Sequence, residues 1–228
     1  MRKVILFAFV ISAFVLSASS TMAQGVCTEV MRRLDKNNKT LQSIKADVTM
    51  VKTNTQLGES DTTYGTTSYL PKTASRVMYA RIDWTKPVEE QIAVIGDSYE
   101  LYRPRLNQVI QGKTNSTKTS GSAGGALAFM NMSRDQLKAN YDVACYADET
   151  ISGGILTWRL HLTPKNATSY KVADLWVDQD GFPRQTKVIE KNDDSTTVLL
   201  SNIKKNETIK ADSFRLAYDK KKVKIIKG

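Results

Sequence analysis

A two-residue alternation of apolar and polar side chains recurs along most of this chain and constrains its fold more than any other feature. Every second side chain is apolar over residues 44–51, and the same period returns over residues 76–84. This is the pattern of a β-strand with one covered face and one face in water. The repetition predicts a mainly β protein built from short antiparallel strands.

Turn sequences separate these strands at regular spacing. Residues 96–97, 152–154 and 192–194 are rich in Gly, Asn and Asp, which end one strand and begin the next. The chain then holds about ten strands, which predicts an antiparallel barrel or a strongly curved sheet. The lysine-rich end, residues 220–227, is expected to be a solvated edge strand, because lysine there discourages pairing with another sheet.

One helix is expected before the sheet. Apolar residues recur at helical spacing over residues 26–34, with charged residues on the opposite side, which predicts a short amphipathic helix. Cys27 in this segment and Cys145 are the two cysteines of the chain, and a disulfide between them would tie the helix to the sheet. The sequence leaves open whether that bridge forms. Lipidation of Cys27 is disfavoured, because the residues before it do not form a lipobox.

A second helical piece is expected to interrupt the strands midway. Residues 112–125 are mostly Lys, Thr, Asn, Ser, Gly and Ala, a composition typical of a flexible loop. The apolar residues Leu127, Phe129 and Met130 follow, and residues 133–136 (SRDQ) then match a capping box that starts a helix. We expect this region to form a short helical lid that can move over the sheet.

The first residues have the pattern of a secretion signal. Residues 1–3 carry positive charge ahead of an apolar run to Leu16, and small residues lead to Ala23. Cleavage after Ala23 is expected, and residues 24–228 then form a single domain, since one all-β domain reaches roughly 200–250 residues. An uncleaved anchor is the alternative, but the run is shorter than the roughly 20 residues that span a bilayer. The protein is expected to be exported and soluble.

Residues that would support catalysis or metal binding are sparse. His161 is the only histidine, which excludes histidine-rich metal sites and makes a Ser or Cys triad depend on this one residue. Its apolar neighbours predict an outward-facing histidine on a strand. Residues 112–114, 122–124 and 178–181 share only fragments with phosphate-loop, nucleophile and calcium motifs. We therefore expect no catalytic residues, no metal site and no cofactor.

Several segments share their order and spacing with a known family. They are residues 41–49 (LQSIKADVT), 79–87 (YARIDWTKP), 91–104 (QIAVIGDSYELYRP), 162–165 (LTPK), 178–181 (DQDG) and 211–214 (ADSF). Together they resemble the outer-membrane lipoprotein carrier family, LolA and its relatives, across nearly the whole mature chain. The resemblance implies an incomplete antiparallel β-barrel, covered by helices, around an apolar cavity.

The resemblance also implies a function. Such carriers take lipoproteins from an ATP-driven inner-membrane complex and deliver them to an outer-membrane receptor, without changing any bond. This chain would then be a periplasmic, monomeric carrier that binds acylated lipoproteins or lipids and no nucleic acid. Each buried methylene contributes about 0.8 kcal/mol to such binding. The residues expected to line the cavity are Val48, Met50, Met78, Ala80, Ile82, Trp84, Tyr99, Leu101, Leu127, Phe129 and Met130.

The chain departs from the family pattern at two places. Family members often hold the lid closed through an arginine just before a proline in the strand preceding residues 79–87. Residues 69–72 (YLPK) stand there instead, and Arg76 follows, so Lys72 and Arg76 are the candidates for this latch. The usual Pro-Gly after Phe214 is also absent. These departures suggest a divergent relative with other lipid cargo.

Two other functions remain open from the sequence. One is a periplasmic lipid-sensing or protein-binding module on the same fold, with a small cavity. The other is a secreted hydrolase with an unrecognised site, which the lone histidine disfavours. The net charge of +10 is spread along the chain and weakly favours acidic partners.

Overall fold

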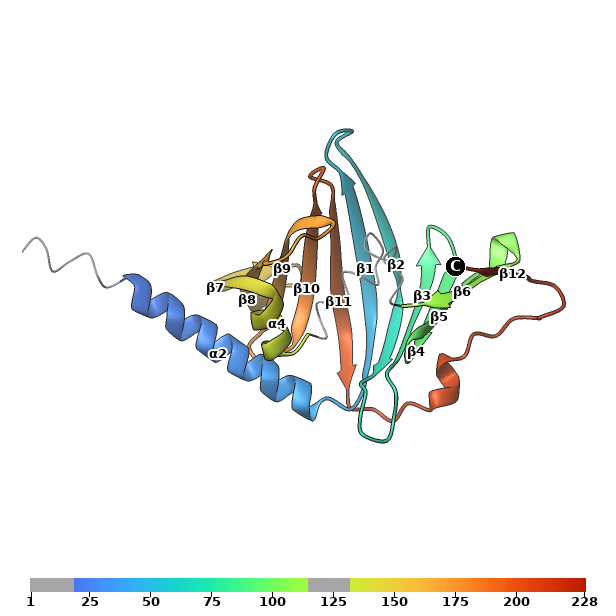
Figure 1. Cartoon of the computed structure of the whole chain (residues 1–228), viewed down its shortest axis with the longest axis horizontal. Coiled ribbons are helices and arrows are strands. Elements are labelled where there is room, and N and C mark those ends of the chain that lie inside the picture. Colours follow the sequence, from blue (N-terminus) through green and yellow to red (C-terminus); the bar gives the residue numbers. More distant parts are fainter. Residues whose placement is uncertain (1–18, 115–131) are drawn as a thin grey trace, which may run out of the picture.

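The computed structural model describes residues 19–114 and 132–228, and Figure 1 shows their strands as one curled sheet. The elements are α2 (Ser19–Thr40), β1 (Ile44–Asn54), β2 (Glu59–Leu70), β3 (Tyr79–Lys86), β4 (Glu90–Ile95), β5 (Ser98–Arg103), η1 (Pro104–Leu106), β6 (Gln108–Lys113), α4 (Arg134–Asn140), β7 (Tyr141–Ile151), β8 (Ile155–Pro164), β9 (Tyr170–Asp178), β10 (Pro183–Glu190), β11 (Ser195–Lys205), η3 (Ala211–Phe214) and β12 (Lys224–Lys227). The 12 strands of these ranges follow the order β12-β6-β5-β4-β3-β2-β1-β11-β10-β9-β8-β7. All neighbours are antiparallel except β12 and β6, which are parallel.

This architecture confirms the predicted fold class. The protein is mainly β, with an N-terminal helix and an open sheet whose two edges, β7 and β12, do not pair with each other. The barrel is therefore incomplete. The C-terminal β12 is an edge strand, as its lysines predicted, although it spans only Lys224–Lys227.

Helix α2 is longer than the predicted helix of residues 26–34. Its polar last turns remain helical because the terminal carbonyls are satisfied: the Thr40 hydroxyl donates to the Lys36 carbonyl (3.0 Å) and the Leu41 N–H donates to the Asn37 carbonyl (3.0 Å). Apolar spacing marks only the stretch of a helix that faces its sheet, so it underestimates both ends. No helix in the described part of the chain has the length and apolar character to cross a bilayer.

Helices α2 and α4 lie on one face of the sheet, which we call the inner face, beside strands β7 to β11 (Figure 1). Val30 and Leu34 of α2 are fully buried in the same apolar cluster as Leu160 of β8. A disulfide between Cys27 and Cys145 joins α2 to β7, which settles in this structure the bridge that the sequence left open. We call strands β7 to β11 with these two helices the covered half.

The short helix α4 begins at the predicted capping box. The Ser133 hydroxyl accepts from the Gln136 N–H (3.2 Å), and the Gln136 side-chain oxygen accepts from the Ser133 N–H (2.8 Å). Two of the unpaired donors at the helix start are thereby satisfied. Leu137 is fully buried and anchors α4 in the core.

The chain after β11 crosses the opposite, outer face of the sheet before it forms β12. Phe214 in η3 is fully buried, and its ring centroid lies 5.5 Å from that of Tyr79. Arg81 donates hydrogen bonds of 2.8 and 3.1 Å to backbone carbonyls of this segment. Ala93 and Val109 are buried on the same outer face, with exposed fractions of 3% and 0%. The outer face of β3 to β6 is therefore a packed one.

Candidate functional site

The inner face of strands β3 to β6 is apolar but only partly covered. Strand register places Ile82, Ile92, Leu101 and Ile110 in one row, each opposite the next. Ile82 is 5% exposed, whereas the other three are half-buried. No α-helix of residues 19–114 or 132–228 lies across this row (Figure 1). We call strands β3 to β6 together with β12 the open half.

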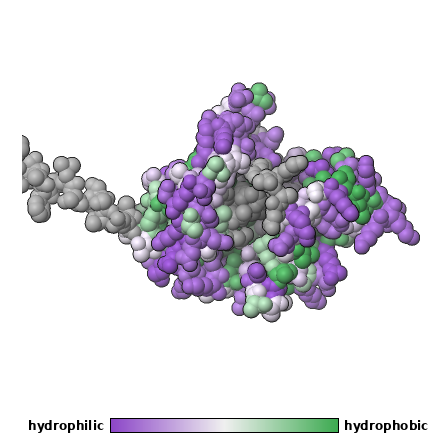
Figure 2. All heavy atoms as spheres, in the orientation of Figure 1, coloured by the Kyte–Doolittle hydropathy of each residue, from purple (hydrophilic) through white to green (hydrophobic). Residues whose placement is uncertain are grey.

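A second row of paired residues on the inner face of β3 to β6 is also apolar. It runs through Ala80, Val94 and Tyr99 to Gly112. A Cβ at Gly112 would lie only 2.6 Å from the Tyr99 ring, so glycine leaves room for that ring to lie flat over β6. Figure 2 shows hydrophobic residues gathered around the open half, while the surface over α2 is mostly hydrophilic. An apolar surface of this kind is typical of a binding face.

The row nearest to the β3–β4 turn is polar and bounds the apolar surface. Arg103 of β5 donates from Nε to Glu90 of β4 at 3.0 Å. Both side chains are about one-third exposed, at 36% and 32%, so the pair lies at the boundary with solvent. This arrangement leaves a continuous apolar surface between a polar boundary and the core.

The structure brings many of the predicted lining residues to one face. Those on the inner face and packed into the core are Val48, Met50, Ile82 and Trp84, and those on the inner face but half-buried are Ala80, Tyr99 and Leu101. Met78 is half-buried but precedes β3 rather than lying in it. Leu127, Phe129 and Met130 fall outside the described residues. Sequence reasoning missed Ile92, Val94 and Ile110, because β4 is apolar on both faces and only the strand register assigns these residues to the inner face.

The latch candidates lie in the loop that joins β2 to β3. Lys72 is exposed, and Arg76 is half-buried. The Arg76 guanidinium donates from Nη2 to the Pro71 carbonyl at 3.1 Å, so it stabilises its own loop. A role in holding a lid remains a prediction.

Two tyrosines on the sheet, Tyr69 and Tyr170, have a raised pKa. Tyr69 of β2 lies opposite Ala80 of β3 on the inner face, and burial raises its pKa. Tyr170 of β9 contacts Tyr141 through their hydroxyl groups at 2.6 Å. Burial, and then this hydrogen bond, raise the pKa of Tyr170 well above its usual value. Both phenols are therefore neutral at physiological pH.

His161 lies in a polar network on the outer face of β7 to β9. Its Nδ1 is 2.7 Å from Asp174, which also accepts from Arg159 at 3.1 Å. Arg159 in turn donates to Glu149 at 2.7 Å, and Glu149 accepts from the Trp176 indole at 2.8 Å. The predicted outward-facing strand position is confirmed, but the hydrogen bond to Asp174 was not predicted, because it depends on the register of neighbouring strands. Among the described residues, no three His, Cys, Asp or Glu side chains converge as a metal site.

Comparison with protein families identifies this architecture. The family model of the outer membrane lipoprotein carrier protein LolA matches residues 71–217. The chain belongs to the LolA family. The matched region includes strands β3 to β6 of the open half and all strands of the covered half of this LolA-family protein, but not α2 or β12. Comparison with curated protein sequences gives no significant match.

Solved structures resemble this LolA-family chain in fold at low sequence identity. A conserved protein from Thermus thermophilus is 13% identical with a TM-score of 0.55, and the match covers 89% of this chain and 99% of that one. MucB is 13% identical with a TM-score of 0.52, over 87% of this chain and 64% of that one. A LolA superfamily protein from Nitrosomonas europaea is 14% identical with a TM-score of 0.43, over 83% and 97% of the two chains. These likenesses concern the fold alone.

Proposed function

We propose that this chain binds the acyl chains of lipoproteins on the inner face of its open half and shuttles them from the inner to the outer membrane. The observation that supports this most is the half-buried apolar row of Ile92, Leu101 and Ile110. Ile92 also packs against the main core, but Leu101 and Ile110 do not belong to that cluster. The outer face of β3 and β4 is packed by the segment around Phe214, so these strands have a packed face besides the row. Family membership points in the same direction.

The proposal includes the cellular setting that the sequence suggests. Export through a signal peptide cleaved after Ala23 would place the carrier in the periplasm. Its partners would be an ATP-driven complex in the inner membrane and a receptor in the outer membrane. The protein would act as a monomer and catalyse no bond change, since the acyl chains are held by burial alone.

A matched pair of variants tests the acyl-chain site. Ile92→Glu places a carboxylate on the inner face, whereas Gln91→Glu places the same charge one residue away on the outer face. Because a carboxylate facing an acyl chain must lose its water, Ile92→Glu is expected to weaken binding of a fluorescent fatty acid about tenfold. Gln91→Glu is expected to bind like the unmodified protein. The affinity is measured by fluorescence titration, with circular dichroism as the check on folding.

Mass spectrometry of material that co-purifies with the protein then identifies the cargo. Acylated lipoproteins released only by detergent would support the carrier function. Equal affinities for the two variants would show that the acyl chain does not lie on the inner face of β4. A protein that co-purifies with protein partners but binds no acyl chain would favour a protein-binding module on the same fold.

A further inference from the structure

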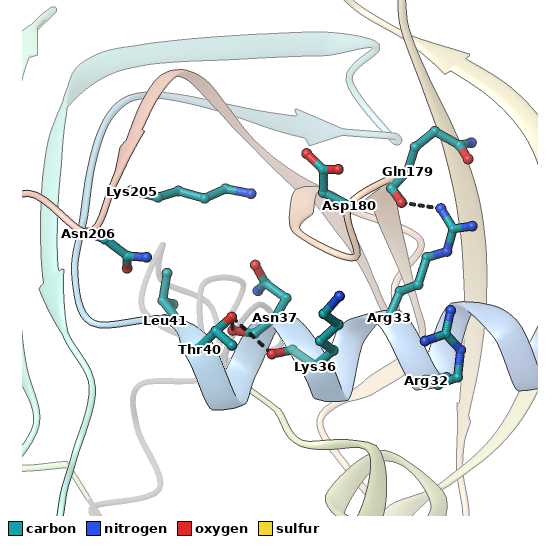
Figure 3. A pocket seen from close by; sticks show the side chains of 10 residues that line it. All are labelled: Arg32, Arg33, Lys36, Asn37, Thr40, Leu41, Gln179, Asp180, Lys205 and Asn206. Carbon is teal, nitrogen blue, oxygen red and sulfur yellow. Dashed lines mark hydrogen bonds between the residues drawn. The ribbon is translucent and has the colours of Figure 1, made fainter.

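A basic pocket lies apart from the open half, between α2, the turn joining β9 to β10, and the end of β11 (Figure 3). Its volume is about 420 Å³. Four cationic side chains line it, from Arg32, Arg33, Lys36 and Lys205, against the single carboxylate of Asp180. Figure 3 shows Lys36 and Lys205 extending into the same opening from α2 and from β11. The pocket therefore concentrates positive charge from separate elements.

The four cations are not equally free to bind a ligand. Glu29 accepts from Arg32 at 2.7 Å and from Arg33 at 2.6 Å, and these hydrogen bonds lower the pKa of Glu29 to about 2. Arg33 also donates to the Gln179 carbonyl. The ammonium of Lys205 lies 4.6 Å from the centre of the Phe182 ring. Within the described ranges, neither Lys36 nor Lys205 forms an ion pair, so their charges remain available.

The wall of the pocket opposite Lys205 is held in place by close packing. Gly181 in the β9–β10 turn has a positive φ of 83°, and a Cβ there would overlap the backbone of Arg33. Only glycine lets the turn rest directly on α2. Asp178 fixes the turn by accepting from the N–H groups of Asp180 (3.0 Å) and Phe182 (2.8 Å). The spacing between α2 and the turn is thus set before any ligand binds.

One buried donor at the pocket lacks a partner. Asn37 lines the pocket and is 9% exposed. Its Nδ2 is buried and has no hydrogen-bond partner among the described residues. Buried amide groups are normally satisfied, and half a turn of this amide about its last side-chain bond exchanges its oxygen and nitrogen positions. The NH₂ group would then take the position of the amide oxygen, which faces the opening in Figure 3, and could donate to an acceptor bound in the pocket.

We propose that this pocket binds a phosphate group, with Lys36 and Lys205 supplying the charge and Asn37 a neutral donor. A phosphate offers several acceptor oxygens and so matches several donors that converge from different elements. The pocket opens to solvent, which leaves room for whatever carries the phosphate, a lipid headgroup or a free ion. The site goes beyond the proposed acyl-chain function, because it shares no residue with the open half.

The competing explanation is structural. Lys36 lies near the C-terminal end of α2, where cations stabilise the helix dipole. That role would account for Lys36 and Lys205 without a ligand, but it does not require a pocket or explain the unpartnered amide of Asn37. The two explanations differ in what neutralising the lysines does: a dipole role alters the stability of the protein, and a phosphate site alters binding.

The test uses the mature protein and the double variant Lys36→Gln/Lys205→Gln. The matched control is Lys220→Gln/Lys221→Gln, which removes the same charge from an exposed segment away from the pocket. Phosphate binding is measured by NMR titration with inorganic phosphate, following the backbone amides of α2 and the β9–β10 turn. Co-sedimentation compares vesicles of phosphatidylcholine alone with vesicles that also contain phosphatidylglycerol. Fatty-acid binding and thermal unfolding are recorded for each variant.

We expect the affinity of the pocket variant for phosphate to fall by about tenfold or more, because two charge-assisted contacts are lost. The comparison uses the form of phosphate that the wild type binds. The control variant and fatty-acid binding should be unchanged, so failure of this site and failure of the acyl-chain site are distinguishable. Phosphate shifts without vesicle binding would identify a free phosphate as the ligand, and preference for phosphatidylglycerol vesicles would identify a headgroup. The proposal is overturned by wild-type protein that binds neither, by equal losses in both variants, or by a pocket variant that changes stability alone.

Discussion

The two halves of the sheet are packed on opposite faces. In the covered half, α2 lies on the inner face and buries Leu160 and Leu162 completely. In the open half, the segment around Phe214 packs on the outer face of β3 and β4, where Ala93 is buried. Further along, Tyr218 packs against Tyr102, the strand partner of the buried Val109. The inner face of the open half keeps an apolar row that is only half-buried. The inner face of the sheet is therefore packed under helices at one end. At the other end, no helix of the described residues lies over it.

This difference explains how the chain can keep an apolar surface without losing its fold. Each strand needs one well-packed face to be stable in water. The open half meets that requirement on its outer face through Phe214 and Arg81. The proposed acyl-chain site lies on the other, inner face of these strands.

Removal of the disulfide is expected to have the largest effect on stability, with the greatest loss of local protection in the covered half. Cys27 and Cys145 are separated by 118 residues, and the chain-entropy model gives about 5 kcal/mol for closing a loop of this size. The variant Cys27→Ser/Cys145→Ser should lose about that much unfolding free energy in urea denaturation. Hydrogen exchange should speed up more in α2 and β7, which the bridge joins, than in β3 to β6. Equal loss of protection in all strands would contradict independent packing of the halves.

Truncation of one leucine in each half is the next comparison. Leu160→Ala opens a cavity in the covered half and should reduce the unfolding free energy by about 3 kcal/mol. Leu101→Ala removes a half-buried side chain from the open half and should cost about 1 kcal/mol. Urea denaturation measures both. Fatty-acid affinity should fall for Leu101→Ala and stay constant for Leu160→Ala, and the reverse order would show that the cargo lies under α2.

The sequence predicted the sheet well because its signal is local. Alternation and turn residues identified the strands, and the capping box at Ser133 placed the start of α4. The length of α2 was underestimated, because hydrogen bonds such as that of Thr40 to Lys36 extend a helix beyond its apolar stretch. The Cys27–Cys145 pairing was left open, since cysteine spacing alone does not give the distance between a helix and an edge strand.

The site was harder to predict, because it depends on which face each strand packs. In β4 both faces are apolar, with Ile92 and Val94 on the inner face and Ala93 and Ile95 on the outer one. Alternation within β4 cannot tell which face is covered. The docking of Phe214, more than 100 residues later in the chain, decides it. Val48 and Met50 of β1, predicted as cavity lining, lie on the inner face and are packed in the core, and their contact with a ligand stays a prediction.

Tyrosine ionisation gives the smallest and most local test of the same division. Burial raises the folded-state pKa of Tyr69 at the edge of the open half and of Tyr170 in the covered half. A raised folded-state pKa means that the associated stability is fully present below the unfolded value of about 10 and is lost as pH rises through the folded value. Protein stability should therefore decline at alkaline pH, and Tyr69→Phe should reduce that decline.

A bound acyl chain should change the pKa of one of the two tyrosines and not that of the other. If it lies on the inner face of the open half, it removes further water from Tyr69 and raises the pKa of that phenol again. Tyr170 is already enclosed with Tyr141 and should titrate as before. NMR spectra of ring-labelled tyrosine, with Tyr69→Phe to assign the signal, follow both groups with and without fatty acid. An unchanged Tyr69 beside a shifted Tyr170 would place the ligand in the covered half, against the arrangement argued from the packing of Phe214 and α2.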